Sequence, residues 1–325
     1  MSKDIESLRI GILGTANIAP ACVVVPARKI SKVEVAAVAS RTQAKANRFA
    51  KIYNIPITFA SYDELIESPQ IDLVYIALPI SEHATWALKA ANAGKHVLVE
   101  KSFALNEAQA ISMIEMADTK NVRIFEAFHY RYHPLFQEFL HWLESGKAGI
   151  VKYVDAEFSV AIPEVATDIR QVRDLGGGAL RDLGCYPINW ILNIVNELPT
   201  DVNAQCILNK FNVDELVEGS LRFPSGIRAK FRTCMKPEQK LVRRLTVTGT
   251  KDKIIFENPL APHEGGQLYL KSHPLKKANV DNGTTYFHQL SAIKKAIASG
   301  ESVPTEGKNI LRQQSVIDMI YAHMT

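Results

Sequence analysis

The chain has 325 residues, 47% hydrophobic and 22% charged, with ordinary glycine and proline contents, which excludes collagen-like, disordered and low-complexity classes. Its formal net charge of +4 is small for this length, so charge alone indicates neither a nucleic-acid nor a membrane partner. The apolar runs are only as long as strands, so we expect no membrane span. The four cysteines are dispersed without a CxxC pair and the first residues are polar, so we expect a cytoplasmic location.

The first 125 residues alternate short aliphatic runs with segments of helical periodicity, the pattern of parallel strands joined by crossover helices. The runs are apolar on both faces, as in a sheet covered by helices on both sides. Residues 1–128 are therefore predicted to form a doubly wound α/β domain. Strands are expected at 8–13, 33–39, 73–77, 96–99 and 122–125. Two helices are expected over 42–53 and 82–93. Two more are expected to begin at a capping box at 61–64 and at the cap residue Asn106.

From about residue 150 the pattern changes to a period of two: Val154, Ala156 and Phe158 alternate with Asp155 and Glu157. Residues 129–325 are therefore predicted to form an α+β domain with an open, mostly antiparallel sheet. Further strands are expected at 217–223, 227–234, 243–248 and 253–257, with a hairpin turn at 224–226. Helices expected over 180–196, 285–299 and 308–323 would cover one face of this sheet.

The other face of this sheet carries basic residues at alternating positions. Acidic residues alternate into similar positions and no stacking aromatic residues lie among them, so we expect a solvated or subunit-contacting surface rather than a polyanion site. The basic residues are Arg222, Arg228, Lys230 and Arg232.

A loop of small residues follows the first predicted strand. Gly14-Thr15-Ala16-Asn17-Ile18-Ala19 departs from G-x-G-x-x-G by having alanine at the second and third glycine positions. Small residues let the backbone approach a pyrophosphate and let the next helix present its N–H groups to the phosphates. Two interpretations stand: a dinucleotide site, which the strand before and the helix after favour, and a loop that only packs closely.

The end of the second predicted strand bears on the choice of cofactor. An NAD site usually has an acid there for the ribose 2′-hydroxyl, whereas this chain has Ser40-Arg41-Thr42. The Arg41 guanidinium suits a 2′-phosphate, and Ser40 and Thr42 add hydroxyl donors. We therefore expect NADP(H), with NAD(H) as the second choice, unless Arg41 is only a solvated residue at a helix start.

Two distant segments carry groups suited to proton transfer. Glu100 and Lys101 follow the fourth predicted strand, so Lys101 is expected at the sheet edge where ligands bind. The glycine run 176–178 precedes a helix on which Asp182 and Tyr186, four residues apart, share a face. An ammonium favours a nearby phenolate and a carboxylate holds the arrangement, so Lys101, Tyr186 and Asp182 are candidate catalytic residues.

Five motifs together resemble the Gfo/Idh/MocA oxidoreductases, a family named after glucose–fructose oxidoreductase, inositol dehydrogenase and a rhizopine-catabolism protein. They are Gly14–Ala19, Leu78-Pro-Ile-Ser-Glu-His83, Gly94-Lys-His-Val-Leu-Val-Glu-Lys101, Glu126-Ala-Phe-His-Tyr-Arg-Tyr-His-Pro134 and Gly176-Gly-Gly-Ala-Leu-Arg-Asp-Leu-Gly-Cys-Tyr186. The resemblance covers the whole chain and points to the branch of NADP-linked aldose dehydrogenases, dihydrodiol dehydrogenases and sugar ketoreductases. It implies a Rossmann domain, a mostly antiparallel sheet domain, and hydride transfer between nicotinamide and a sugar-like carbinol or carbonyl.

The resemblance also implies roles for single residues. Lys101 matches the lysine of the family's Glu-Lys-Pro motif, which touches the nicotinamide ribose and the substrate oxygen. Asp182 matches the acid after the glycines, and Tyr186 stands where many members have histidine. Cofactor contacts are implied for Leu78, Pro79, His83, Glu100 and Arg170, and a substrate contact for Tyr286.

Some of these assignments have alternatives. His83 is equally suited to a helix-start position satisfied by backbone groups, and Tyr286 to an ordinary place in the core. Ser102 replaces the proline of the family's Glu-Lys-Pro motif. Gln171 follows Arg170 where family members often have tryptophan, so a different pocket wall is expected.

Together these observations predict an NADP-dependent dehydrogenase or reductase acting on CH–OH groups of a carbohydrate or cyclic diol. A reductase of nucleotide-linked sugars and an NADP(H)-binding sensor without turnover are the alternatives. We expect a homodimer or homotetramer formed through the second sheet, and no nucleic-acid partner. No metal is expected, because His129 and His133 lie beside Pro134 and aromatic residues despite their four-residue spacing.

Overall fold

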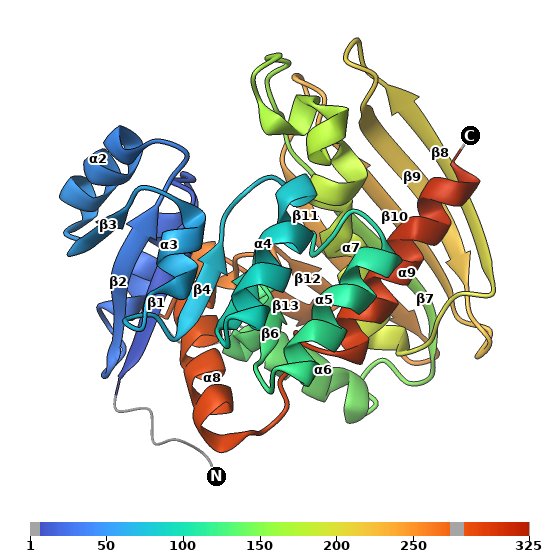
Figure 1. Ribbon diagram of the computed structural model, residues 1–325. Coiled ribbons are helices and arrows are strands. Elements are labelled where there is room, and N and C mark those ends of the chain that lie inside the picture. The colour runs from blue at the N-terminus through green and yellow to red at the C-terminus, as the bar shows by residue number, and fades with distance from the viewer. Residues whose placement is uncertain (1–6, 274–282, 325) are drawn as a thin grey trace. The chain divides into compact units, whose positions relative to one another are not determined.

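A computed structural model describes residues 7–273 and 283–324, whose contacts divide them into two compact units (Figure 1). The first unit holds the described residues up to Arg131 together with Tyr286–Leu311. The second runs from Tyr132 to Thr285 and continues from Arg312. The sequence predicts a boundary after residue 128 and an uninterrupted second domain, whereas by contacts residues 286–311 join the first unit.

The first unit is built on six parallel strands in the order β3-β2-β1-β4-β5-β6. The strands are β1 (Leu8–Leu13), β2 (Val33–Ala39), β3 (Ile57–Phe59), β4 (Leu73–Ile76), β5 (His96–Val99) and β6 (Ile124–Glu126). The helical segments are η1 (Pro20–Val24), α1 (Val25–Ala27), α2 (Gln43–Tyr53), α3 (Tyr62–Glu67), α4 (Ile80–Asn92), α5 (Glu107–Thr119) and α8 (Thr285–Ser299). This order confirms the predicted doubly wound domain, and β3 is a strand that the sequence pattern did not predict.

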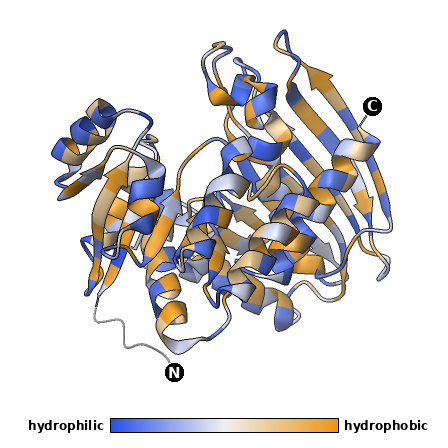
Figure 2. Cartoon of the chain, viewed as in Figure 1, coloured by the Kyte–Doolittle hydropathy of each residue, from blue (hydrophilic) through white to orange (hydrophobic). Residues whose placement is uncertain are grey.

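Helices cover both faces of this sheet, which explains why its strands are mostly apolar, as their orange colour in Figure 2 shows. On one face, the strand residues Val74, Ile76 and Val99 pack with α3, α4 and α5. On the other face, the strand residues Ile10, Tyr75 and Phe125 pack with η1, α2 and α8.

The predicted caps at Ser61 and Asn106 are confirmed by side-chain hydrogen bonds, and Thr42 is the N-cap of the helix expected over 42–53, whereas the helix expected from residue 82 begins at Ile80. The Thr42 hydroxyl accepts from the Lys45 amide at 3.4 Å at the start of α2, and the Asn106 side chain accepts from the Gln109 amide at 3.0 Å at the start of α5. At α3, the Ser61 hydroxyl accepts from the Glu64 amide at 3.2 Å. These caps satisfy N–H groups that the first turn of a helix leaves without a partner.

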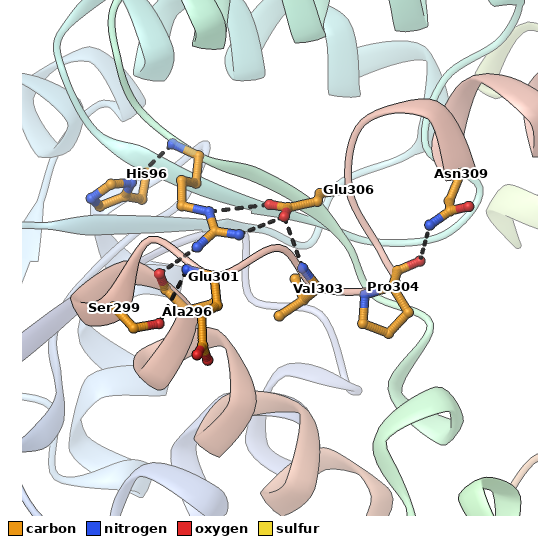
Figure 3. A network of polar contacts seen from close by, with 9 residues as sticks. His96, Ala296, Ser299, Glu301, Val303, Pro304, Glu306 and Asn309 are labelled. Carbon is orange, nitrogen blue, oxygen red and sulfur yellow. Dashed lines mark hydrogen bonds and ion pairs between the residues drawn. The ribbon is translucent and has the colours of Figure 1, made fainter.

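The expectation that residues 285–299 cover the second sheet is wrong. Leu290 and Ile293 of α8 are buried against the parallel sheet of the first unit. A polar network then fastens the segment after α8 to β6 (Figure 3). Arg123 binds Glu306 through two bonds, of 3.1 and 2.5 Å, and donates to the Ala296 carbonyl. An amphipathic helix has one apolar face, and the apolar face of α8 packs in the hydrophobic core of the first unit.

The second unit contains a seven-stranded sheet in the order β13-β12-β11-β7-β10-β9-β8, antiparallel except for the pair β7 and β10. The strands are β7 (Val151–Ser159), β8 (Asp201–Leu208), β9 (Asp214–Arg222), β10 (Arg228–Cys234), β11 (Val242–Gly249), β12 (Lys253–Glu257) and β13 (Gln267–Leu270). The helical segments are α6 (Pro134–Glu144), η3 (Ile169–Gln171), η4 (Arg173–Leu175), η5 (Leu180–Gly184), α7 (Cys185–Val195) and η6 (Pro262–Glu264). Two further segments, η2 (His129–Tyr132) and α9 (Lys308–His323), begin in the first unit and end in the second.

The alternation predicted for this sheet is observed. Val154, Ala156 and Phe158 of β7 are buried, and blue and orange alternate along β8 to β10 in Figure 2. On the polar face, Arg232 of β10 pairs with Glu157 at 2.7 Å and with Glu218 at 3.5 Å. Basic residues on this face are therefore partly neutralised across strands. No described helix is long and apolar enough to cross a membrane.

Candidate active site

Strand register brings the motif loops of the first unit to one edge of its sheet. Leu13 of β1 lies beside Ala39 of β2 and Ile76 of β4, and Ile76 lies beside Val99 of β5. The next residues are Gly14, Ser40, Ala77 and Glu100, so all of these loops leave the sheet at its carboxyl edge. Neighbouring strands are about 4.8 Å apart, which places the loops within the span of a dinucleotide.

The Gly14 loop requires glycine at its first position. Gly14 has φ +93°, and a Cβ there would stand 2.7 Å from the Ala77 carbonyl oxygen. Ala19 is fully buried in the core beneath the loop, whereas Asn17 and Ile18 are exposed and Thr15 and Ala16 partly so. The backbone of residues 15–18 therefore lies at the surface, and the small residue at position 19 lets helix and strand pack closely, as a pyrophosphate loop needs.

Ser40 and Arg41 lie next to this loop. The Gly14 amide donates to the Ala39 carbonyl at 2.9 Å, which places the end of β2 beside the glycine turn. Ser40 is buried and Arg41 exposed, while the Thr42 hydroxyl is used as the cap of α2. Burial raises the pKa of the Tyr62 phenol, and the charge of Arg41 opposes this shift. An exposed guanidinium is thus available at this end of the sheet.

The Leu78, Pro79 and His83 segment forms the turn into α4. Pro79 is the N-cap residue, and the fully buried His83 ring lies one turn inside the helix. Its Nε2 is 2.9 Å from the Leu78 carbonyl oxygen, and its Nδ1 is 3.0 Å from the Ser102 carbonyl oxygen. Burial lowers the pKa of His83, and Lys101 lowers it further, against the raising effect of these carbonyl groups. His83 thus ties the loop after β4 to the loop after β5.

Glu100 and Lys101 leave β5 among buried polar groups. The Tyr75 hydroxyl donates to the Glu100 carboxylate at 2.6 Å, and the Cys22 thiol donates to the same oxygen at 3.5 Å. Burial raises the pKa of Glu100, while Tyr75 and Lys101 oppose the shift. The peptide bond between Lys101 and Ser102 is cis, at the position where the family's motif has proline.

Glu126, at the end of β6, is a buried carboxyl group that the motif analysis did not single out as functional. It accepts from the Phe103 amide at 3.1 Å, two residues after Lys101. Burial raises its pKa to about 8, and the charge of Glu100 adds to the shift, whereas Lys101 and Arg131 oppose it. Lys101 therefore has two carboxyl groups in its electrostatic surroundings, Glu100 and Glu126.

In the second unit, the predicted helix after the glycine run consists of a π-helical turn, η5, followed by α7. Asp182 lies in η5 and Tyr186 in α7, where the ring of Tyr186 packs edge-on against Phe158 with centroids 5.6 Å apart. The Arg170 side chain, which the resemblance assigns to the cofactor, donates to Asp182 at 2.7 Å and lies 3.4 Å from Asp168. Asp182 raises the pKa of Arg170.

Tyr286 and the two histidines have packing contacts. Tyr286 of α8 is partly buried, with its ring centroid 4.1 Å from that of His129. His133 is the N-cap of α6 and accepts from the Leu135 amide at 3.1 Å. Within residues 7–273 and 283–324, no group of three or more His, Cys, Asp or Glu side chains is arranged to hold a metal ion.

Comparison with protein families matches both units of the chain. Residues 8–128 match the model described as an oxidoreductase family with an NAD-binding Rossmann fold, and residues 136–255 match the Gfo/Idh/MocA C-terminal domain.

Curated relatives match over most of the chain. A D-xylose 1-dehydrogenase (NADP(+)) of Haloferax volcanii is 31% identical, covering 97% of this chain and 96% of the relative. A trans-1,2-dihydrobenzene-1,2-diol dehydrogenase of Xenopus laevis is 31% identical over 82% of each chain. Among solved structures, aldose-aldose oxidoreductase from Caulobacter crescentus has a TM-score of 0.89 at 24% identity, covering 98% of this chain and 97% of that one. That structural likeness supports the two-part fold.

Proposed function

We propose that this chain, which belongs to the Gfo/Idh/MocA oxidoreductase family, transfers hydride between NADP(H) and a carbinol or carbonyl carbon of a carbohydrate or cyclic diol. The observation that carries the proposal is the strand register of the first unit. It gathers the Gly14 loop, the Arg41 segment and Lys101 at one sheet edge, the edge at which open α/β sheets bind ligands.

The residues at this edge fit a dinucleotide phosphate. The tight turn at Gly14 leaves no room for a side chain, and the exposed backbone of residues 15–18 would hold the pyrophosphate. Ser40 and Arg41 would hold the 2′-phosphate, and no carboxylate follows β2 to favour a 2′-hydroxyl. Leu78 and Pro79 would contact the cofactor from the next loop, while Glu100 and His83 would keep the loops in place. NAD(H) is the weaker alternative cofactor.

A bound nicotinamide supplies or accepts the hydride, and the chain's own residues handle the proton. Tyr186 would remove the proton from the substrate hydroxyl in oxidation and return it to the carbonyl oxygen in reduction. The Lys101 ammonium would stabilise the phenolate and the substrate oxygen. Asp182 would orient these groups, because its carboxylate is fixed by Arg170 at 2.7 Å. Tyr286 is proposed to contact the substrate.

The decisive test is a spectrophotometric panel with NADPH and keto-sugars or dicarbonyls, and with NADP+ and aldoses, inositols or diols. We expect NADPH-linked turnover with at least one carbohydrate-like compound, and tighter binding of NADPH than of NADH in a fluorescence titration. NADPH binding without turnover on any compound would favour a sensor, and turnover confined to nucleotide-linked sugars would favour the ketoreductase. The absence of binding to either reduced cofactor would refute the proposal.

Assembly and location are part of the proposal. A homodimer or homotetramer would form through the polar face of the second sheet, where Arg232, Glu157 and Glu218 form cross-strand pairs. Light scattering of the wild-type chain and of an R232E variant tests this, since charge reversal in that face would weaken the assembly. A reducing cytoplasm suits the four cysteines, which are all thiols.

A further inference from the structure

Asp214 is a buried carboxyl group in the second unit that neither the motifs nor the proposed mechanism uses. It opens β9 and is only 5% exposed. Its Oδ2 accepts from the Leu180 amide at 2.7 Å, across 34 residues of sequence. Leu180 is the first residue of η5, whose own N-cap residue, Ala179, makes no side-chain hydrogen bond. The helix start that carries Asp182 and Tyr186 therefore receives its cap from a strand.

The glycine run is shaped around this carboxylate. Gly178 has φ +120°, and a Cβ there would stand 2.2 Å from Oδ1 of Asp214. The Gly178 amide donates to the Arg170 carbonyl at 3.0 Å, and the Asp182 amide donates to the Gly178 carbonyl at 3.0 Å. The glycine run is thus held in place, with Asp214 against Gly178 and the Gly178 amide bonded to the Arg170 carbonyl.

The same segment is fastened from a second side through the Arg170 side chain. Its guanidinium binds Asp182 at 2.7 Å, and its backbone amide donates to Asp168 at 2.9 Å. Asp182 is therefore fixed both by its side chain and, through Gly178 and Leu180, by Asp214. Tyr186 follows one turn later on the same helical segment, so its position depends on the same anchors.

We propose that Asp214 is a positioning residue for the reaction: its carboxylate caps the first turn of η5 and thereby fixes Asp182 and Tyr186 for proton transfer. The proposal rests on the proposed function of Asp182 and Tyr186. A charged acceptor is suited to this task because hydrogen bonds to an ionised carboxylate are stronger than those to a neutral group, and negative charge is favoured at a helix start.

The surroundings of Asp214 make the cap sensitive to pH. Among the described residues, side chains of three elements interact electrostatically with it: Arg181 of η5, Tyr321 of α9 and Cys206 of β8. The Tyr321 hydroxyl donates to Oδ1 at 3.5 Å, and the Arg181 guanidinium lies 4.4 Å from the Tyr321 ring centroid. Burial raises the pKa of Asp214 to about 6, although the Leu180 amide, Arg181 and Tyr321 oppose the shift. The carboxylate is charged above that pH and becomes neutral below it.

The test is the variant D214N, which keeps the size of the side chain and an oxygen acceptor for the Leu180 amide but removes the charge. We expect kcat of the NADP-linked reaction to fall about tenfold or more, with KM for NADP(H) within about twofold of wild type. Wild-type kcat should decline on the acid side through the titration of Asp214, and the variant should lack this limb of the pH profile. D201N, an exposed aspartate on the neighbouring strand β8, is the matched control and should resemble wild type.

Amide hydrogen exchange separates failure of this proposal from failure of the proposed function. Exchange of residues 180–186 should accelerate in D214N but not in D201N, and this readout needs no substrate. Wild-type turnover combined with an unchanged kcat, pH profile and exchange rate in D214N would overturn the role of Asp214 alone. If D214N does not fold, Tyr321→Phe decides. The Tyr321 hydroxyl lowers the pKa of Asp214, so its loss should move the acid limb of the kcat–pH profile to higher pH while the maximal kcat stays unchanged. An acid limb at the wild-type pH would overturn the proposal.

Discussion

Replacing Glu126 by glutamine should remove much of the pH dependence of the stability of the first unit. The carboxyl group is 2% exposed and accepts from the Phe103 amide at 3.1 Å. A glutamine can accept the same bond through its side-chain oxygen. The substitution therefore changes the ionisation of the site while keeping its volume and its hydrogen bond.

The magnitude follows from the pKa of the group in the two states. Burial raises the Glu126 pKa from 4.5 to about 8, so the folded chain binds this proton more tightly than the unfolded chain. The stabilisation is complete below the unfolded pKa and is lost as pH rises through about 8. Between about pH 5.5 and about pH 9, the linkage relation gives a loss of about 3 kcal/mol.

Urea unfolding followed by circular dichroism measures this loss. The free energy of unfolding of the wild type should fall over that pH range by about 3 kcal/mol more than that of E126Q. At the alkaline end E126Q should be the more stable protein, because it carries no buried charge. Glu115 on the exposed side of α5 is the control, and E115Q should follow the wild type. Parallel curves for wild type and E126Q would refute the reasoning.

Three further predictions concern the candidate site. Removing the guanidinium in R41A should weaken NADPH binding about tenfold or more while changing NADH binding little, as measured by fluorescence titration. The buried ring of His83 bridges two loops, so H83A should lower the free energy of unfolding by about 3 kcal/mol and also weaken NADPH binding; an unchanged melting temperature would contradict the bridging role. R170A should lower kcat about tenfold, because Asp182 loses its 2.7 Å partner, and should leave the Kd for NADPH within about twofold. If R170A instead weakens NADPH binding at unchanged kcat, the cofactor contact implied by the family resemblance is the better account.

Much of the first unit could be predicted because its signals are local. Apolar runs bounded by polar turns identify β1, β2, β4 and β5, and the residue types at Thr42, Ser61 and Asn106 identify three helix starts. The gathering of Gly14 and Lys101 at one edge also follows, since carboxyl ends of parallel strands share an edge. The three-residue strand β3 is too short to show a period.

Other features depend on long-range packing that a local pattern does not contain. The apolar face of α8 could pack on either sheet. Only the packing of Leu290 and Ile293 on the parallel sheet determines that α8 joins the core of the first unit. The side chain of Arg170 reaches Asp182 because the glycine run folds back on residues 169–170. The strand β8, which the sequence analysis does not predict, alternates with Val202 and Ala204 buried, so its period-two signal is local.

Asp214 and Glu126 could not be identified as important from spacing. Each is an acidic residue at one end of a strand, without a spacing pattern that marks it, and its partner amide lies 34 residues away for Asp214 and 23 for Glu126. Their significance comes from burial, which makes an ionisable group costly unless hydrogen bonds and nearby charges compensate it.

Pre-steady-state rates of NADPH oxidation in Lys101→Met, Tyr186→Phe and the double variant test the central claim most directly. If the ammonium and the phenol serve one proton transfer, each single variant should lose about a hundredfold or more in the hydride-transfer step, with the Kd for NADPH within a fewfold of wild type. The double variant should then be little slower than the slower single variant, because the two groups act as a unit. Near-wild-type rates in both single variants would contradict the account.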